Sequence, residues 1–280
     1  MNPCMYSPRC DYFFFSFLDL HWKWLKPKEM IKLAEYVIRI HVRNLALFLL
    51  TLMIISCSQS KGIKLFNGES LEGWEGSGTI FRVESGAIVG GSLEKPIEES
   101  HYLCTEKQYG NFELKLAAKF VTNDLQVNGG ISFRAKRVPD SHEVMGYQAD
   151  LGYVDAKIIP LFSDFIPQDT SGGIYPLWGC LVDENRPTLS RYPRPDVYPV
   201  IFYNLVDREL IEGIMDPKDW NEVHIIANGP NIEIRINGIQ TANFSEKDNV
   251  PEKGCICLQT HSGGPFEIWY KDITLTELVP

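Results

Sequence analysis

The sequence contains no apolar stretch that is long enough to cross a lipid bilayer comfortably. Its longest apolar run, residues 45–55, is shorter than the roughly 20 residues that a transmembrane helix needs. An excess of basic residues is also missing, since 27 Lys and Arg stand against 36 Asp and Glu and give a formal charge of −9. Proteins that bind nucleic acid usually show the reverse balance. These absences speak against a membrane-spanning helix and against a nucleic-acid partner.

Several motifs that carry chemistry in other proteins are missing as well. No glycine-rich phosphate loop follows a predicted strand, and no nucleophile elbow of the Gly-x-Ser-x-Gly type occurs. The histidines that follow the apolar run, His101, His142, His224 and His261, lack the spacing of metal ligands. We therefore predict no metal site and no bound cofactor, although the sequence remains compatible with a structural or catalytic divalent cation.

The N-terminus reads as an export leader. Basic residues precede the apolar run, and Ser56 and Cys57 follow it, which is the order of a secretory signal. Residues 54–57, Ile-Ile-Ser-Cys, resemble a bacterial lipobox, in which the cysteine is acylated and becomes the first residue of the mature protein. We predict that Cys57 carries the lipid that anchors an exported protein to a bacterial cell envelope membrane, facing the periplasm or the cell surface. A plain signal peptide with an incidental cysteine is the alternative.

These signals divide the chain into a leader, a short polar tether and one large domain. The leader is residues 1–56, the tether is residues 57–62, and the domain is residues 63–280. Within the leader, residues 1–29 fit no signal peptide. We predict that translation starts at Met30 and that residues 1–29 precede the true start. A genuine extension is the alternative.

Four cysteines remain in the domain: Cys104, Cys180, Cys255 and Cys257. An exported protein can form disulfides. Cys255 and Cys257 lie on the same face of a predicted strand and are badly placed to pair with each other. We interpret all four as free thiols, because a domain of this size needs no disulfide to fold.

The domain alternates apolar and polar residues with a period of two, which predicts β-strands. The pattern is clear over residues 112–120 and 231–236, and Asn237-Gly238 predicts a tight hairpin turn after the second of these runs. No segment shows an amphipathic helix of several turns. Many short strands separated by turns predict an all-β fold, either a sandwich or a barrel. Residues 155–199 lack a clean period and read as loops over one face.

Three predicted strands place polar side chains on the face opposite their core residues. For any one strand, a solvated surface is the simpler explanation. The combination of an arginine, an acid, amides and an imidazole suggests a site. These residues are Ser132 and Arg134, Gln148 and Asp150, and Gln259 and His261.

A tryptophan beside acids and an arginine marks the irregular segment. Trp178 is followed by Asp183, Glu184 and Arg186. Such a set suits a sugar, because an aromatic ring stacks on a pyranose and polar groups bind its hydroxyls. A structural ion pair with a packed tryptophan is an equally good interpretation.

An ordered set of motifs resembles the 3-keto-disaccharide hydrolase family. Each motif is weak alone, but their order along residues 63–280 is specific. The motifs lie at residues 65–74, 128–134, 146–150, 178–186, 220–222, 236–238 and 258–261. The resemblance implies a concanavalin A-like jelly roll, a β-sandwich of two antiparallel sheets, and secreted lipoproteins that cleave glycosides oxidised to a ketone at C3. It also implies a sugar or glycoside substrate and functional pairing with a sugar 3-oxidoreductase. One departure is an unusually long segment between Leu151 and Leu177.

A ketone at C3 acidifies the proton on C2, so cleavage can proceed by proton abstraction, β-elimination and hydration. We hypothesise that His261 is the base, because imidazole titrates near neutral pH. Asp150 would orient it or act as the base instead. Glu184 or Asp183 would protonate the leaving oxygen.

The remaining candidates would bind the substrate. Arg134, Gln148 and Gln259 would stabilise the enolate. Trp178 would stack on the sugar ring, and Arg186 would contact its hydroxyls. Two other functions remain open: a non-catalytic carbohydrate-binding lipoprotein on the same sandwich, and a scaffold for a partner oxidoreductase.

Overall fold

The computed structural model describes residues 26, 28, 31–32, 35–44, 62–124, 126–157, 159, 173–184, 200–248 and 250–279. The chain divides into two compact units, Met1–Gln59 and Ser60–Pro280. In the first unit, residues 35–44 are helical. Among the described residues, no helix has both the length and the apolar character to cross a membrane. Cys57, the predicted lipid site, lies outside the described residues.

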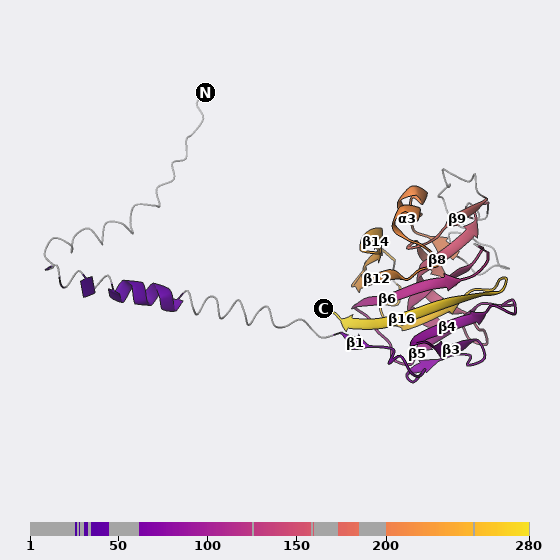
Figure 1. The fold of residues 1–280 in the computed structure, drawn as a ribbon, viewed down its shortest axis with the longest axis horizontal. Coiled ribbons are helices and arrows are strands. Elements are labelled where there is room, and N and C mark those ends of the chain that lie inside the picture. Colours follow the sequence, from indigo (N-terminus) through magenta and orange to yellow (C-terminus); the bar gives the residue numbers. More distant parts are fainter. Residues whose placement is uncertain are drawn as a thin grey trace, which may run out of the picture. The chain divides into compact units, whose positions relative to one another are not determined.

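The second unit consists of two antiparallel sheets, which confirms the predicted all-β fold (Figure 1). The first sheet has the strand order β14-β13-β12-β6-β16-β4-β3, with β1 added beside β16. Its strands are β1 (Ile63–Lys64), β3 (Phe81–Glu84), β4 (Ala87–Ser92), β6 (Phe112–Val121), β12 (Asn221–Asn228), β13 (Asn231–Ile236), β14 (Ile239–Ser245) and β16 (Phe266–Glu277).

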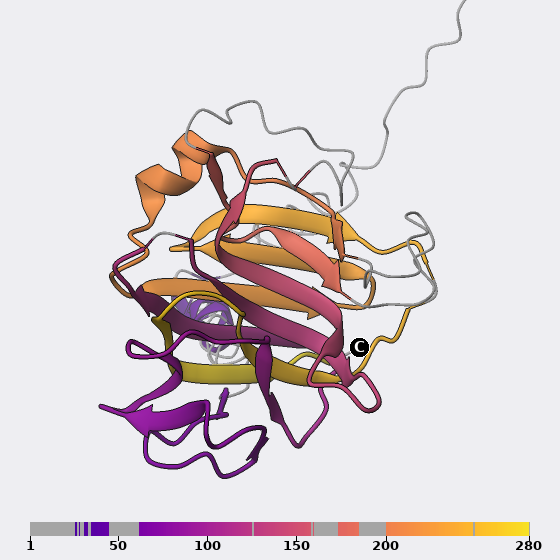
Figure 2. The same ribbon diagram turned by 90° about the vertical axis from the view of Figure 1, so that its right-hand side faces the viewer.

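The second sheet has the order β11-β10-β8-β7-β15-β5-β2, with β9 paired to β8. Its strands are β2 (Trp74–Glu75), β5 (His101–Thr105), β7 (Asn128–Arg137), β8 (Val144–Asp155), β9 (Ile174–Pro176), β10 (Leu181–Glu184), β11 (Val200–Phe202) and β15 (Cys255–Thr260). The short helix α3 (Arg208–Ile214) lies at one edge of the sandwich (Figure 2). Because β9 and β10 fall within residues 155–199, the prediction of loops alone for that segment is wrong.

The core lies between the two sheets and contains aromatic rings from both. Phe112 meets Phe133 edge-on with 6.2 Å between ring centroids, and Phe120 meets Trp178 at 5.8 Å. All four side chains are at most 1% exposed, and burying one such ring contributes about 2–3 kcal/mol. The apolar positions of each strand therefore decide which face turns inward.

The end of the β7–β8 hairpin folds over the outer face of the second sheet. The register of β7 against β8 shifts after Phe133, and Arg134 adopts a φ of 49° there. Such a β-bulge bends the strand. Beyond the bulge, Ala135 and Val144 join Tyr102 in a small apolar cluster separate from the main core. The bend thus brings the hairpin end over β5.

The bulge also turns Arg134 away from the outer face that Ser132 occupies. Its Nε donates to Gly110 O at 3.0 Å, its Nη1 to Gly229 O at 2.8 Å and its Nη2 to Asn111 Oδ1 at 3.3 Å. The side chain is 2% exposed. The prediction that Arg134 faces outward beside Ser132 is wrong, because strict alternation fails at a bulge. Arg134 instead joins β7 to the first sheet.

Cys104 and Cys257 form a disulfide between β5 and β15. The two residues are paired in register, with 4.0 Å between their Cα atoms, and belong to the small outer cluster. The interpretation of these two as free thiols is wrong, because the sequence does not reveal that their strands are neighbours. Cys180 and Cys255 are free.

Candidate active site

A chain of buried hydrogen bonds crosses the outer face of the second sheet. Ser132 Oγ donates to Gln148 Oε1 at 2.9 Å, and Gln148 Nε2 donates to Gln259 Oε1 at 3.1 Å. Gln259 Nε2 then donates to the hydroxyl of Tyr102 at 2.6 Å. All four side chains are at most 3% exposed. Strands β8, β7, β15 and β5 are therefore linked by side chains as well as by their backbones.

Gly130 leaves the space that this chain of hydrogen bonds needs. Gly130 lies in register with Asp150 on one side and with Gln259 on the other. A Cβ atom at Gly130 would lie 2.8 Å from Gln148 Cδ, which is closer than real contacts allow. The absent side chain lets Gln148 reach across β7 to Gln259.

Two glutamates meet at Tyr102, where the chain of hydrogen bonds ends. The hydroxyl of Tyr102 lies 3.2 Å from Glu143 Oε2 and 3.1 Å from Glu184 Oε2. Strands β5 and β10, which carry Tyr102 and Glu184, are separated by three strands. That order puts them roughly 19 Å apart on a flat sheet. Since the two side chains touch, the sheet curves toward this face, and the face is concave.

The carboxyl of Glu184 is adapted to exchange protons near neutral pH. Desolvation raises its pKa from 4.5 to about 7, and the negative charges of Glu143 and Asp183 act in the same direction. The hydrogen bond with Tyr102 opposes this shift. A carboxyl with such a pKa can serve as a general acid or a general base.

Asp150 is a second carboxyl with an altered proton affinity. It is 5% exposed, and desolvation together with the charge of Glu184 raises its pKa well above the ordinary value. Hydrogen bonds from the Leu151 backbone and the Asn128 side chain oppose the shift. Its Oδ1 has no hydrogen-bond partner among the described residues. Burial therefore favours the protonated, neutral form of Asp150.

His261 follows β15 and is half-buried. Its Nδ1 lies 2.8 Å from the carbonyl oxygen of Ser262, and its backbone N–H donates to Asn128 O. A carbonyl oxygen only accepts hydrogen bonds, so Nδ1 carries the proton. In the neutral ring Nε2 is then unprotonated and can accept a proton.

Trp178 and Asp183 do not face the concave surface. Trp178 is fully buried and packs edge-on against Phe120 between the sheets, so the prediction that it stacks on a sugar is wrong. Asp183 is paired in register with the inward-facing Tyr147 and accepts a hydrogen bond from the hydroxyl of Tyr203. Neighbouring residues of a strand face opposite sides, so only Glu184 of the two acids reaches the outer face.

Of the predicted site residues, the structure brings Gln148, Gln259 and Glu184 into one network. Asp150 interacts electrostatically with Glu184. Arg186 lies outside the described residues. Sequence reasoning missed Tyr102 and Glu143.

A sequence signal existed for one of the two missed residues. Tyr102 and Cys104 occupy alternate positions of β5, so recognising the disulfide would have placed Tyr102 on the outer face. Glu143 had no such signal, because the bend that delivers it depends on the bulge.

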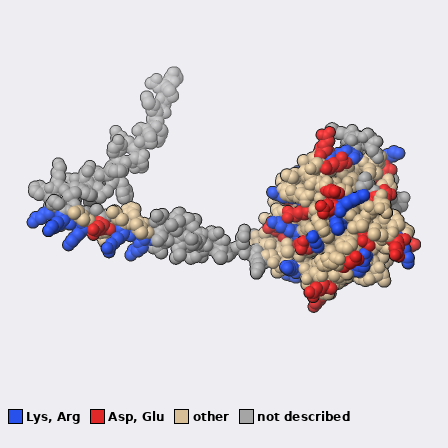
Figure 3. All heavy atoms as spheres, in the orientation of Figure 1, with Lys and Arg blue, Asp and Glu red and all other residues tan. Residues whose placement is uncertain are grey.

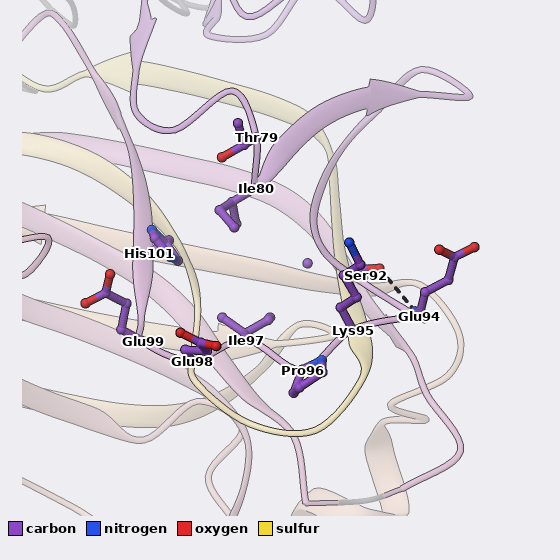
Figure 4. Close-up of a pocket in the computed structure, with 11 residues that line it drawn as sticks. Thr79, Ile80, Ser92, Glu94, Lys95, Pro96, Ile97, Glu98, Glu99 and His101 are labelled. Atoms are coloured by element: carbon purple, nitrogen blue, oxygen red, sulfur yellow. Dashed lines mark hydrogen bonds between the residues drawn. The ribbon is translucent and has the colours of Figure 1, made fainter.

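The structure also contains a cavity of about 480 Å³ that shares no residue with this network (Figure 4). No Trp, Tyr or Phe lines it, so it offers no stacking surface for a sugar. The lining residues are Thr79, Ile80, Gly91, Ser92, Glu94, Lys95, Pro96, Ile97, Glu98, Glu99 and His101. Because this cavity offers no stacking surface, we place the candidate site on the concave face.

Within the described part of the chain, no group of three or more His, Cys, Asp or Glu side chains is arranged to hold a metal ion.

Acidic and basic side chains are interspersed over the visible surface of the second unit (Figure 3). No extended basic area is seen on that face.

Residues 61–276 match the sequence model of the 3-keto-alpha-glucoside-1,2-lyase-like domain, the family that the ordered motifs resemble. No curated protein matches the chain. A structure from Parabacteroides distasonis ATCC 8503, classed as a glycosyl hydrolase, superposes with a TM-score of 0.51 at 19% identity. The match covers 77% of this chain and 93% of that one. The shared fold is the concanavalin A-like jelly-roll sandwich.

Two further structures are similar. A second one from Parabacteroides distasonis, also classed as a glycosyl hydrolase, has a TM-score of 0.48 and 18% identity, over 78% of this chain and all of that one. The carbohydrate-binding module CBM66 from Bacillus subtilis has a TM-score of 0.45 and 13% identity, over 73% of this chain and 96% of the module.

Proposed function

Because the chain belongs to the family of 3-keto-alpha-glucoside-1,2-lyase-like domains, we propose that it cleaves glycosides or disaccharides whose sugar carries a ketone at C3. The family supports a carbohydrate-active role directly, and the finer activity is our proposal. Cleavage would proceed by elimination across C1 and C2, followed by addition of water. The net reaction is hydrolysis of the glycosidic bond.

The chemistry needs three groups on one face. A base removes the acidic C2 proton, a donor stabilises the enolate oxygen, and an acid protonates the leaving oxygen at C1. The observation that carries the proposal is the Glu184 carboxyl on the concave face, since a pKa of about 7 lets it hold a proton at neutral pH. We assign Glu184 as the acid.

His261 is the proposed base. The Ser262 carbonyl fixes the proton on Nδ1 and leaves Nε2 to accept one. Asp150, kept neutral by burial, is the proposed donor to the enolate oxygen, because only a protonated carboxyl can donate a hydrogen bond. Gln148 and Gln259 are 1% exposed, and we propose that they position the network and do not touch the sugar.

The setting of the reaction is also part of the proposal. An acyl group on Cys57 would hold the protein at a cell envelope membrane, facing the periplasm or the cell surface. A sugar 3-oxidoreductase would supply the keto substrate, because this chain offers no route to a C3 ketone in the proposed mechanism.

The test is release of aglycone by the full-length protein from p-nitrophenyl glucosides and from their 3-keto forms. We expect release only from the keto forms. Glu184→Gln and His261→Ala should each slow it by about 10²–10⁴-fold, the usual contribution of general acid–base catalysis. His224→Gln is the matched control, because His224 lies on the first sheet, paired with Glu113.

Two results would overturn the proposal. Equal release from unoxidised glucosides would indicate ordinary glycoside hydrolysis. Binding of the keto sugars without any release would indicate the non-catalytic carbohydrate-binding lipoprotein.

A further inference from the structure

The Tyr102 hydroxyl has three polar neighbours and only one proton. Gln259 Nε2 donates to its oxygen at 2.6 Å, and the carboxyl oxygens of Glu143 and Glu184 lie at 3.2 and 3.1 Å. The hydroxyl can donate its proton to one carboxylate at a time. A second carboxyl that carries a proton of its own can donate it to the tyrosine oxygen at the same distance. The geometry therefore suits a site in which the two carboxyls share one extra proton.

No cation from the described residues takes the place of that proton. Among the described residues, neither Glu143 nor Glu184 forms an ion pair with a lysine, arginine or histidine. Within the described part of the chain, the other titratable groups that act on Glu184 are Asp183 on its own strand and Asp150 on β8, and neither can supply a positive charge. Two carboxylates that share a site without a cation do not both stay ionised at neutral pH.

We propose that Tyr102 is a proton relay between Glu143 and Glu184. In the relay, protonated Glu143 donates its proton to the Tyr102 oxygen while the Tyr102 proton passes to the Glu184 carboxylate. One proton leaves Glu143, one reaches Glu184, and the tyrosine ends with the single proton it began with. The role of the relay in turnover rests on the proposed function: it restores the proton that Glu184 gives to the leaving oxygen.

The fold ties both ends of the relay together. Glu143 arrives on the bent end of the β7–β8 hairpin, and Arg137 fixes that end. Arg137 Nη2 donates to the backbone oxygen of Tyr102 at 3.0 Å, and its Nε pairs with Glu75 Oε1 at 3.1 Å. Tyr102 itself is 3% exposed, whereas Glu143 is only half-buried. Glu143 can therefore exchange protons with solvent and pass them to the buried hydroxyl.

The test is a titration of carboxyl carbons by NMR in the full-length, substrate-free protein labelled with ¹³C at the glutamate carboxyl. Two variants should move the Glu184 titration in opposite directions. Glu143→Gln removes a neighbouring negative charge, so the midpoint of Glu184 should fall by about one pH unit. Tyr102→Phe removes a hydrogen bond that favours ionised Glu184, so its midpoint should rise by a similar amount.

Tyr109→Phe is the matched control. Tyr109 is also buried, at 4% exposure, but lies in the main core, and its substitution should leave the Glu184 titration unchanged. An unchanged midpoint in both Glu143→Gln and Tyr102→Phe would overturn the relay. If Tyr102→Phe fails to fold, Glu143→Gln decides alone, because Glu143 is half-buried on a hairpin end.

Because no substrate is present, this titration is independent of the proposed reaction. Opposite shifts without any cleavage of keto sugars would uphold the relay and reject its part in this activity. Cleavage with unchanged Glu184 midpoints would uphold the function and reject the relay.

Discussion

At the scale of single residues, the face of the strand on which a side chain lies matters more for its proposed role than its residue type. Asp183 and Glu184 are adjacent acids that the sequence could not tell apart. The strand turns one toward Tyr203 in the interior and the other toward Tyr102 on the concave face. Alternation placed Gln148 and Gln259 correctly, because β8 and β15 are regular at those positions. It failed at Arg134, where a bulge interrupts the period.

Glu184 should govern the alkaline side of the activity profile. If Glu184 acts as the acid, kcat/KM should fall as the pH rises through about 7, where the carboxyl loses its proton. Replacement by Gln should remove that limb together with most of the activity. A pH series of initial rates on a 3-keto glucoside, with Glu222→Gln as a surface control on β12, measures this.

The raised pKa of Glu184 also predicts how the stability of the protein depends on pH. The pKa of Glu184 is higher in the folded state than its ordinary value of 4.5, so the unfolded chain binds fewer protons between about pH 4.5 and 7. The contribution of Glu184 to stability therefore falls as the pH rises through that window. We expect Glu184→Gln to raise Tm more at pH 8 than at pH 5. An equal effect at both pH values would contradict the shifted pKa.

Arg134 should matter for stability. Its guanidinium is buried and donates to three oxygens, so Arg134→Leu should lower the free energy of unfolding by about 2–4 kcal/mol in urea denaturation. Arg235→Leu should cost far less, because Arg235 is only half-buried. A folded and stable Arg134→Leu protein without activity would instead return Arg134 to the substrate site.

At the scale of elements, short sequence motifs were enough to predict structure that forms between residues close in sequence. The predicted turn at Asn237-Gly238 joins β13 to β14, and both residues have positive φ, 48° and 82°, as a two-residue hairpin turn requires. The pairing of β5 with β15 was not predictable in this way. About 150 residues separate these strands along the chain, and no local sequence pattern indicates such a contact.

The disulfide between those strands should contribute strongly to stability. It links residues 153 positions apart, and closing so long a loop in the unfolded chain is worth about 3–5 kcal/mol. Replacing Cys104 and Cys257 together by alanine should lower the free energy of unfolding by that amount. Cys255→Ala, at a free thiol on the same strand, should change it little. Equal unfolding midpoints for the double variant and the parent would show that the bond does not form.

At the scale of the whole molecule, the composition and the period of two sufficed to predict an all-β fold, either a sandwich or a barrel, and the family resemblance predicted the jelly-roll sandwich. They could not predict how strongly the second sheet curves, and that curvature decides which side chains meet. Tyr102 and Glu184 approach only because four neighbouring strand spacings bend toward one face. The catalytic proposal therefore depends on tertiary geometry that no single motif encodes.

Export and anchoring make a prediction at the same scale. If Cys57 is acylated, the protein expressed in a bacterium should sediment with the membrane fraction and take up labelled palmitate. Cys57→Ala should abolish the label and release the protein, while Cys255→Ala should leave both unchanged. Palmitate label that persists in Cys57→Ala would reject the predicted lipid site.

The most direct test of the proposed reaction follows the C2 proton. Elimination and hydration replace the C2 hydrogen of the keto sugar with one from solvent. Full-length protein turning over a 3-keto glucoside in D₂O should therefore release sugar with one deuterium at C2, faster than the enzyme-free exchange and much more slowly in His261→Ala. Release of a sugar that keeps its original C2 hydrogen would contradict the elimination mechanism and favour direct hydrolysis.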